Sequence, residues 1–259
     1  MASHGYFRYV SAAERKEKAA KAAEKLRKKE PEMHPVVIRG HKLATTWWGK
    51  AWNDNLERYS DYENRIGRGR SYVRSGAVLD LRIGPGRIVA LVQGSRPYPY
   101  RVEIEIKPLP AKVWASIKKT CAGRIESLGE LVEGRFPKDL ADLFTAKGRG
   151  LFPAPEEISF ACSCPDWAYM CKHVAAVLYG VGARLDEDPR LFFTLRGVEI
   201  EELVAAAVQE KTQAMLDKAE KKSRRILTDV DIAAMFGVEV EMNASEKPRK
   251  RRGRAQTGG

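Results

Sequence analysis

The sequence predicts an α+β fold that combines an antiparallel three-stranded meander with flanking helices, a short strand–turn–helix and a helical C-terminal part. Three observations support this prediction. Residues 100–107 alternate strictly between apolar and charged or polar side chains, which is the period of a half-buried strand. The turn at Gly84-Pro85-Gly86 and the segment 94–97 leave only short connections, and short connections join antiparallel neighbours. Apolar residues at helical spacing recur on both sides of this region.

The individual elements follow from local patterns. Strand patterns occupy the segments 78–83, 87–93 and 100–107. Before them, Thr45 or Thr46 could cap a helix, whose apolar stripe consists of Trp48, Trp52, Leu56 and Tyr59. Helical patterns also run from about residue 110 to 146. Further helical patterns later in the chain continue to about residue 237. The last of these, Asp231 to Phe236, has Thr228 or Asp229 as its cap and ends at Gly237.

Changes in composition divide the chain into five segments. They are a charged, partly helical N-terminal extension (1–35), an α+β domain with the meander (36–150), a cysteine-rich segment (151–182), C-terminal helices (183–240) and a disordered basic tail (241–259). No stretch approaches eighteen apolar residues, so the sequence predicts no membrane span. An apolar fraction of 44% is enough to form a core.

The positive charge lies mostly in the two ends of the chain. The formal net charge is +12, of which residues 1–30 carry +5 (nine Lys and Arg against four Glu) and residues 246–259 carry +5 (six against one). The body from 31 to 245 is therefore +2, that is 12 − 5 − 5. Such a balance suggests a polyanionic partner, although a basic tail can also serve only to keep a protein soluble.

Four possible metal ligands fall within twelve residues: Cys162, Cys164, Cys171 and His173. Thiolates and an imidazole in this combination suit a tetrahedral Zn²⁺, with Zn–S bonds of about 2.3 Å and a Zn–N bond of about 2.0 Å. Four protein ligands leave no position for an activated water. The sequence therefore predicts one structural zinc ion and a zinc-stapled strand–turn–helix.

The spacing of these residues fits such a site. Residues 157–164 alternate as a strand does, and positions two apart on a strand point to the same face, so Cys162 and Cys164 can reach one ion. Positions two apart inside a helix diverge. We therefore expect Cys171 to lie just before the first turn of a helix and His173 to lie within it.

The sequence gives less support to other roles for the cysteines. A disulfide framework belongs to small secreted domains, whereas this chain has 259 residues and no apolar signal segment, which favours a reducing, cytoplasmic location. Iron–sulfur clusters usually take four cysteines. Cys121 completes the helical stripe Val113, Trp114, Ile117, Cys121, so we interpret it as a core residue.

The pattern Cys-x-Cys, a short spacer and Cys-x-His before a small apolar helix resembles the SWIM-type zinc finger. That finger occurs in bacterial and archaeal proteins, in plant Mutator-like transposases and beside Swi/Snf-type ATPases. Further segments resemble the bacterial SWIM-finger proteins: Trp47-Trp48-Gly49, 69–76, 92–97, Leu151-Phe152-Pro153 and 188–197. The resemblance covers roughly residues 40–240 and implies zinc binding, with a proposed role in binding DNA or proteins. It implies no reaction.

The best candidates for nucleic-acid contact in the body lie in an arginine-rich segment. It contains Arg65, Arg68, Arg70, Tyr72 and Arg74, with glycines that leave the backbone free. Guanidinium groups match phosphate oxygens, and a tyrosine can stack on an unpaired base. The alternative is a solvated basic loop that forms ion pairs with Asp61 and Glu63. Arg96 and Lys172 are further candidates.

Two functions follow from these patterns. The first is a zinc-binding protein that binds nucleic acid, DNA rather than RNA, through a basic surface and is associated with the nucleoid. The second is a zinc-stabilised adaptor that docks another protein, for example a Swi/Snf-type helicase. We find no phosphate-binding loop, nucleophile motif or catalytic spacing, so we expect neither an enzyme nor a small-molecule substrate.

Overall fold

The computed structural model describes residues 10–58, 63–122 and 124–220. The helices are α1 (Ala12–Arg27), α2 (Trp47–Glu57), α3 (Glu63–Arg74), α4 (Ala111–Cys121), α5 (Ile125–Val132), α6 (Ala141–Thr145), α7 (Lys172–Glu187), α8 (Leu191–Arg196) and α9 (Ile200–Glu220). The strands are β1 (Val78–Gly84), β2 (Arg87–Val92), β3 (Tyr100–Ile106) and β4 (Ile158–Cys162). Two short 3₁₀ helices are η1 (Lys138–Leu140) and η2 (Pro155–Glu157).

The strands form one antiparallel sheet in the order β1-β2-β3-β4. The predicted meander is therefore present, but the sheet has a fourth strand. This strand is the one predicted to lead into the zinc site, and it pairs with β3 so that Val102 lies opposite Cys162. The sequence showed the strand character of β4. It did not show the partner, because β4 follows β3 only after a long helical segment.

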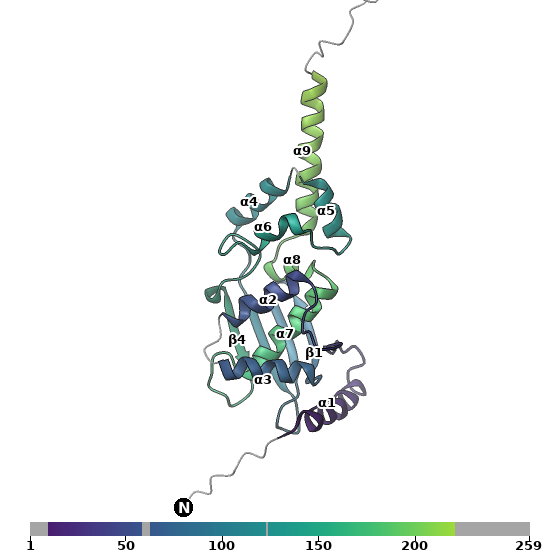
Figure 1. The fold of residues 1–259 in the computed structure, drawn as a ribbon, viewed down its shortest axis with the longest axis vertical. Coiled ribbons are helices and arrows are strands. Elements are labelled where there is room, and N and C mark those ends of the chain that lie inside the picture. The colour runs from purple at the N-terminus through teal and green to yellow at the C-terminus, as the bar shows by residue number, and fades with distance from the viewer. Residues whose placement is uncertain (1–9, 59–62, 123, 221–259) are drawn as a thin grey trace, which may run out of the picture. The chain divides into compact units, whose positions relative to one another are not determined.

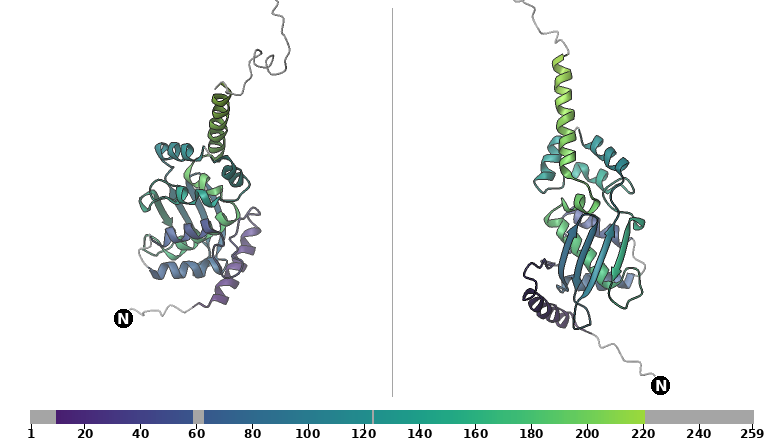
Figure 2. Two further views of the ribbon diagram at one scale, coloured as in Figure 1. Left: turned by 45° about the horizontal axis from the view of Figure 1, so that its top comes forward. Right: turned by 180° about the vertical axis from the view of Figure 1, so that it is seen from behind.

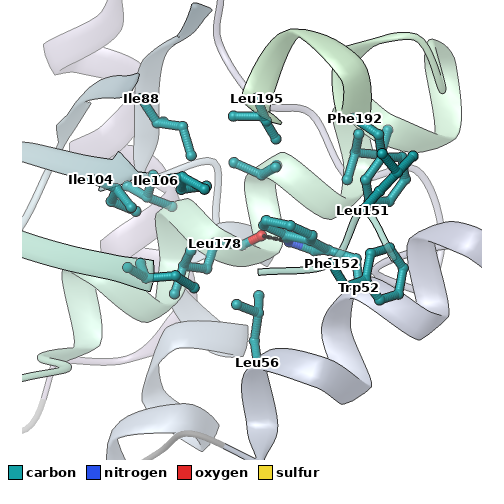
Figure 3. Packing of buried hydrophobic residues seen from close by; sticks show 14 of the residues in the cluster. Trp52, Leu56, Ile88, Ile104, Ile106, Leu151, Phe152, Leu178, Phe192 and Leu195 are labelled. Atoms are coloured by element: carbon teal, nitrogen blue, oxygen red, sulfur yellow. Dashed lines mark hydrogen bonds between the residues drawn. The ribbon is translucent and has the colours of Figure 1, made fainter. Parts of the chain in front are cut away.

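One face of the sheet packs against α7, and α2 and α3 flank that helix (Figure 1). The strand side chains that face α7 are almost entirely buried: Leu81, Ile88, Ala90, Val92, Val102, Ile104 and Ile106. Helix α7 is buried on nearly all its residues from His173 to Gly182. Trp52 of α2 packs into the same core, and its indole N–H donates to the carbonyl of Leu178 at 3.0 Å (Figure 3).

Several local predictions are confirmed. Thr46, not Thr45, caps α2, because its hydroxyl accepts the N–H of Gly49. The region from 110 to 146 is helical, and Cys121 is a fully buried core residue. The helix expected at 231–236 and the basic tail lie outside the described residues.

The glycine-containing segment 65–74, which we expected to be a loop, is a helix instead. It forms most of α3, which packs along α7. Gly69 shows why a glycine is needed there, since a Cβ at this position would lie 2.5 Å from the Cβ of Ala175. The glycine allows two helix backbones to approach closely and does not serve to free the backbone.

Helix α1 is capped at its N-terminus and contacts the body of the protein. Ser11 and Glu14 form a capping box at its start, and Ala19 is buried. Arg15 donates to the hydroxyl of Ser71 on α3, and Lys18 donates to the carbonyl of Ser95 between β2 and β3. Part of the charged N-terminal segment therefore lies beside the finger.

The chain divides into two units, Met1–Thr212 and Gln213–Gly259. Of the second unit, the structure describes the end of α9, as far as Glu220. Among the described residues, no helix is both long and apolar enough to cross a membrane. The finer division into five segments stays a prediction.

Candidate metal centre

The four predicted ligands come together at one end of the sheet. Cys162 is the last residue of β4, and Cys164 follows it two positions later. Cys171 is the N-cap of α7, and His173 lies in its first turn, as predicted. The three sulfurs and an imidazole nitrogen all lie within 4.8 Å of one another. A strand end and a helix start thus supply all four ligand atoms.

The distances fit a tetrahedral ion. Nδ1 of His173 lies 3.9 Å from Sγ of Cys162 and 3.9 Å from Sγ of Cys171. Around a zinc ion with ordinary bond lengths, a sulfur and a nitrogen ligand would be about 3.6 Å apart. Nδ1 is therefore the imidazole atom that faces the sulfurs. Three soft thiolates and one imidazole are a donor set that zinc prefers.

The electrostatics of the site also favour a cation. A hydrogen bond from Cys162 lowers the pKa of the Cys171 thiol to about 4, with smaller help from His173 and the backbone N–H of Val174. The same hydrogen bond, together with burial, raises the pKa of Cys162. Burial lowers the pKa of His173 and so favours the neutral imidazole that a metal needs. These shifts favour a thiolate at Cys171 and a neutral imidazole at His173, the forms in which both groups bind a metal.

Aromatic rings hold the imidazole of His173 in place. The ring of Tyr100 lies over it at a centroid distance of 4.5 Å, and Tyr72 meets it edge-on at 5.4 Å. Gly94 completes this contact, because a Cβ there would lie 2.3 Å from the Tyr100 ring and 2.8 Å from Nε2 of His173. No acceptor contacts that buried Nε2 within the described part of the chain. Ring packing, not a hydrogen bond to Nε2, therefore fixes the orientation of the ligand.

The loop between Cys164 and Cys171 is held by contacts with α3 and β4. Asp166 accepts a hydrogen bond from Arg65 at 3.1 Å, and both side chains are largely buried. The same carboxylate accepts the N–H of Ala168. Tyr169 donates from its hydroxyl to the carbonyl of Ile158 at 2.8 Å. Residues other than the metal ligands thus also help to hold this loop in place.

The structure separates the predicted nucleic-acid contacts into two groups. The first group makes internal contacts. Arg65 binds Asp166, Tyr72 is buried against His173, and Arg70 forms an ion pair with Glu57 at 2.6 Å while donating to the hydroxyl of Tyr179. Burial, followed by the hydrogen bond to Glu57, raises the pKa of that Tyr179 hydroxyl.

The second group is accessible from solvent and consists of Arg68, Arg74, Arg96 and Lys172. Within this group, Arg74 also donates to the carbonyl of His41 at 3.2 Å. Arg96 lies over the ring of Tyr100 at 5.6 Å from its centroid. Burial raises the pKa of Tyr72, and the charges of nearby Arg68 and Arg15 act against that rise. Lys172, next to His173, helps to lower the pKa of the imidazole, after the larger effect of burial. Three of these cations, Arg68, Arg96 and Lys172, therefore lie close to the ring stack of the metal site.

The sequence analysis missed two accessible aromatic residues at this end, Tyr98 and Trp167. They are 62% and 78% exposed. The signal that could have revealed them was their setting in the turns Pro97-Tyr98-Pro99 and Pro165-Asp166-Trp167, outside the apolar pattern of any strand or helix.

Comparisons with known proteins agree with this site. A family model described as SWIM zinc finger matches residues 161–181, which contain all four candidate ligands. An uncharacterized protein of Mycobacterium tuberculosis, Rv2102, is 36% identical over 210 residues, covering 80% of this chain and 75% of that protein. No solved structure matches the chain significantly.

Proposed function

Since the chain belongs to the bacterial SWIM-type zinc finger family, we propose that it holds one structural Zn²⁺ and binds nucleic acid through the basic surface around the finger. We define this finger surface by Arg68, Arg96 and Lys172, together with Arg74 at the C-terminal end of α3, which also donates to the carbonyl of His41. The proposal describes a binding protein and not an enzyme, because four protein ligands would leave no open position on the metal.

The ion would be held by Cys162, Cys164, Cys171 and His173, and it would cross-link the end of β4 to the start of α7. Three thiolates and a neutral imidazole around Zn²⁺ leave a net charge of about −1. The sulfur of Cys171, the N-cap of α7, also lies at the positive end of the helix dipole, which stabilises a thiolate. The metal centre would thus be a structural support for the surface around it.

The observation that carries the nucleic-acid proposal is the set of cations around the ring stack. Arg68, Arg96 and Lys172 come from three different elements, namely α3, the β2–β3 turn and α7, and they lie around the same rings. The acidic residue of the finger loop, Asp166, is already occupied by Arg65. An array of guanidinium and ammonium groups on rigid elements suits a phosphate backbone.

Charge reversal on this surface tests the proposal. In the full chain, Arg68→Glu, Arg74→Glu and Arg96→Glu together lower the formal charge from +12 by six, to +6. We expect affinity for a fluorescein-labelled DNA to fall and the slope of log K against log salt to flatten by about 3, since each lost phosphate contact removes about one unit. Fluorescence anisotropy across a salt series measures both quantities.

The matched control carries the same charge change elsewhere. Lys112→Glu, Lys119→Glu and Lys147→Glu are exposed changes at the end of the sheet where α4 and α6 lie (Figure 1). This variant should keep the salt slope of the wild type. Equal losses in the two triple variants would show that total charge, and not the finger surface, determines binding. The resemblance to DNA-associated families favours DNA over RNA, and the same series with RNA decides between them.

A second surface favours the adaptor as the other candidate function. The face of β2 to β4 turned away from α7 is not covered by a helix in the described part of the chain (Figure 2). Val89 and Leu91 are partly accessible there, beside the ion pairs that Glu103 makes with Arg87 and Arg101. A protein partner, for example a Swi/Snf-type helicase, could dock on this face. The adaptor becomes the better account if the full chain binds no nucleic acid.

A further inference from the structure

A groove with a basic lining runs between α1 and α3. Its volume is about 370 Å³, and it is lined by Ala12, Ala13, Lys16, Gly67, Ser71, Arg74 and Ser75. None of these residues is acidic, whereas two carry a positive charge and two carry a hydroxyl group. Alanines on the α1 wall and a glycine on the α3 wall leave the space open, with room for a phosphate group and several waters.

The two walls of the groove are fixed relative to each other (Figure 1). Arg15 of α1 donates to the hydroxyl of Ser71 on α3 at 2.9 Å. On the same helix, Ala19 is buried, and Lys18 donates to the carbonyl of Ser95 at 2.7 Å. A ligand would therefore enter a preformed groove, and little conformational entropy would be lost when it binds.

Lys16 has no anionic partner on its own helix. Residues three and four positions apart are neighbours on a helix surface. For Lys16 all four of these neighbours are alanines, namely Ala12, Ala13, Ala19 and Ala20. Lys21 and Lys28 differ, because each pairs with the glutamate four positions before it. Within the described part of the chain Lys16 forms no ion pair or hydrogen bond, so its ammonium group is available to an anion in the groove.

Ser71 is placed to donate a hydrogen bond into the groove. Its hydroxyl oxygen accepts from Arg15, and its own proton has no acceptor among the described residues. The adjacent guanidinium polarises this hydroxyl and makes it a stronger donor. Ser75 has a different role, because its hydroxyl donates to the carbonyl of Tyr72 at 2.8 Å. Ser71 is therefore the hydroxyl of the groove that remains available to a ligand.

The groove is continuous with the finger surface. Arg74 belongs to both, and its hydrogen bond to the carbonyl of His41 uses only one of its several N–H donors. Arg15, which joins the two walls, lies over the ring of Tyr72 at 5.9 Å from its centroid. The same ring contacts His173. One polyanion could therefore contact the groove and the cations around the metal site together.

We propose that the groove between α1 and α3 binds a phosphate group, with Lys16 and Arg74 as its counter-charges and Ser71 as a hydrogen-bond donor. This inference rests on the proposed function and extends it, because the group would be one backbone phosphate of the bound nucleic acid. An ammonium group, a guanidinium group and a hydroxyl without an acidic neighbour are suited to phosphate oxygens. Helix α1 then belongs to the nucleic-acid interface.

Two variants of the full chain test the groove in different ways. Lys16→Ala removes one counter-charge and should flatten the slope of log K against log salt by about 1, measured with the fluorescein-labelled DNA. Gly67→Leu fills the groove at unchanged charge and should lower affinity by about five- to tenfold in about 0.1 M salt, the contribution of one phosphate contact. A Cβ at Gly67 meets no atom within 4 Å, and leucine favours a helix over glycine, so this variant should fold.

Lys25→Ala is the matched control for Lys16→Ala. Both lysines are exposed on α1, but they are separated by about two and a half helical turns and so lie on opposite sides of the helix. Lys25→Ala removes the same charge and should keep the affinity and the salt slope of the wild type. Inorganic phosphate, compared with chloride at equal ionic strength, should compete with DNA for the wild type more than for Gly67→Leu.

The outcomes separate this inference from the proposed function. If Lys16→Ala and Gly67→Leu bind DNA like the wild type while the arginine triple variant loses binding, the groove inference is wrong and the finger surface stands. Equal losses in Lys16→Ala and Lys25→Ala would also overturn the inference, because charge would then act without the groove.

A chain that binds no DNA would contradict the proposed function. The groove inference would then stand as a site for free phosphate only if inorganic phosphate raised the thermal midpoint of the wild type and not that of Gly67→Leu. Without such a rise both would fail. Zinc content and the thermal midpoint, measured for each variant, distinguish a loss of binding from a loss of folding.

Discussion

The two ends of the sheet are stabilised by different kinds of packing. At the finger end, glycines allow close packing: Gly69 brings the backbone of α3 against Ala175 of α7, and Gly94 leaves room for the rings of Tyr100 and His173. At the other end, large rings fill the space between α2, α8 and the segment before η2. The rings of Trp52, Phe152 and Phe192 lie 5.0 to 6.3 Å apart there.

The two ends therefore differ in the interactions that stabilise them. The buried rings of Tyr72 and Tyr100 at the finger end pack around a polar imidazole beside three thiols, so this end gains less from the hydrophobic effect, and a metal there would add a cross-link. The aromatic end buries large apolar areas and needs no ion. Tryptophan follows the same division, since Trp52 is 1% exposed and Trp167 is 78% exposed. The end with the proposed metal site is also the one where Arg68, Arg96 and Lys172 are accessible to solvent.

The largest expected effect comes from breaking the metal centre. Cys164→Ser should abolish stoichiometric zinc and lower the free energy of unfolding by more than about 5 kcal/mol, because structural zinc sites bind with apparent free energies of about 10 kcal/mol or more. Helix α7 begins at this site and forms the centre of the core, so the loss should spread beyond residues 158–182. Metal analysis and urea unfolding measure the two effects, and hydrogen exchange locates the loosened segments.

The control for this prediction is the fourth cysteine. Cys121 is buried in α4 and is not part of the ligand cluster. Cys121→Ala should keep full zinc and cost about 1 kcal/mol as a small core truncation. If Cys164→Ser retained zinc and stability to the same degree as Cys121→Ala, the proposed ligand set would be wrong.

The next largest effect is expected at the aromatic end. Trp52→Ala removes a buried ring and its hydrogen bond to Leu178, and should cost about 3 to 5 kcal/mol without loss of zinc. The matched variant Trp167→Ala should change the free energy of unfolding by less than about 0.5 kcal/mol, since that ring is exposed. Urea unfolding of both variants gives the comparison. Similar losses in the two would contradict the division between a buried ring that stabilises the core and an exposed ring that contributes little to stability.

The sequence was sufficient where a single local pattern determined the structure. The alternation of residues 100–107 predicted β3, and the spacing of the four ligands predicted both the strand before them and the position of Cys171 at a helix start. In each case, the geometry of a strand or a helix turn fixes neighbouring side chains. No distant contact is needed to interpret the pattern.

The sequence was insufficient where long-range packing determined the structure. Gly67 and Gly69 suggest a flexible loop when considered alone, but α3 forms because Gly69 fits against α7, about a hundred residues later in the chain. In the same way, Arg65 and Arg70 resemble phosphate contacts, yet Asp166 and Glu57 bind them in the fold. A count of charges cannot distinguish a cation that holds the protein together from one that is available to a ligand.

The smallest effect tests the close packing at the finger end with two glycines of one helix. A Cβ at Gly69 would lie 2.5 Å from the Cβ of Ala175 and 3.1 Å from its backbone, whereas nothing lies within 4 Å of a Cβ at Gly67. Gly69→Ala should therefore push α3 away from α7 and cost about 1 to 3 kcal/mol. Gly67→Ala should instead stabilise the protein by about 0.5 to 1 kcal/mol, because alanine favours the helix.

This pair is informative because the two substitutions are expected to change the free energy of unfolding in opposite directions. Both changes add one methyl group to α3, so helix propensity alone predicts the same stabilisation for both. A loss confined to Gly69→Ala, measured by urea unfolding with zinc in excess, would show that the interface between α3 and α7 has no free volume. Because Tyr72 of the same helix contacts His173, the displaced α3 should also weaken zinc retention against a chelator. If Gly69→Ala were as stable as Gly67→Ala and held zinc equally well, the finger end would not depend on close backbone packing.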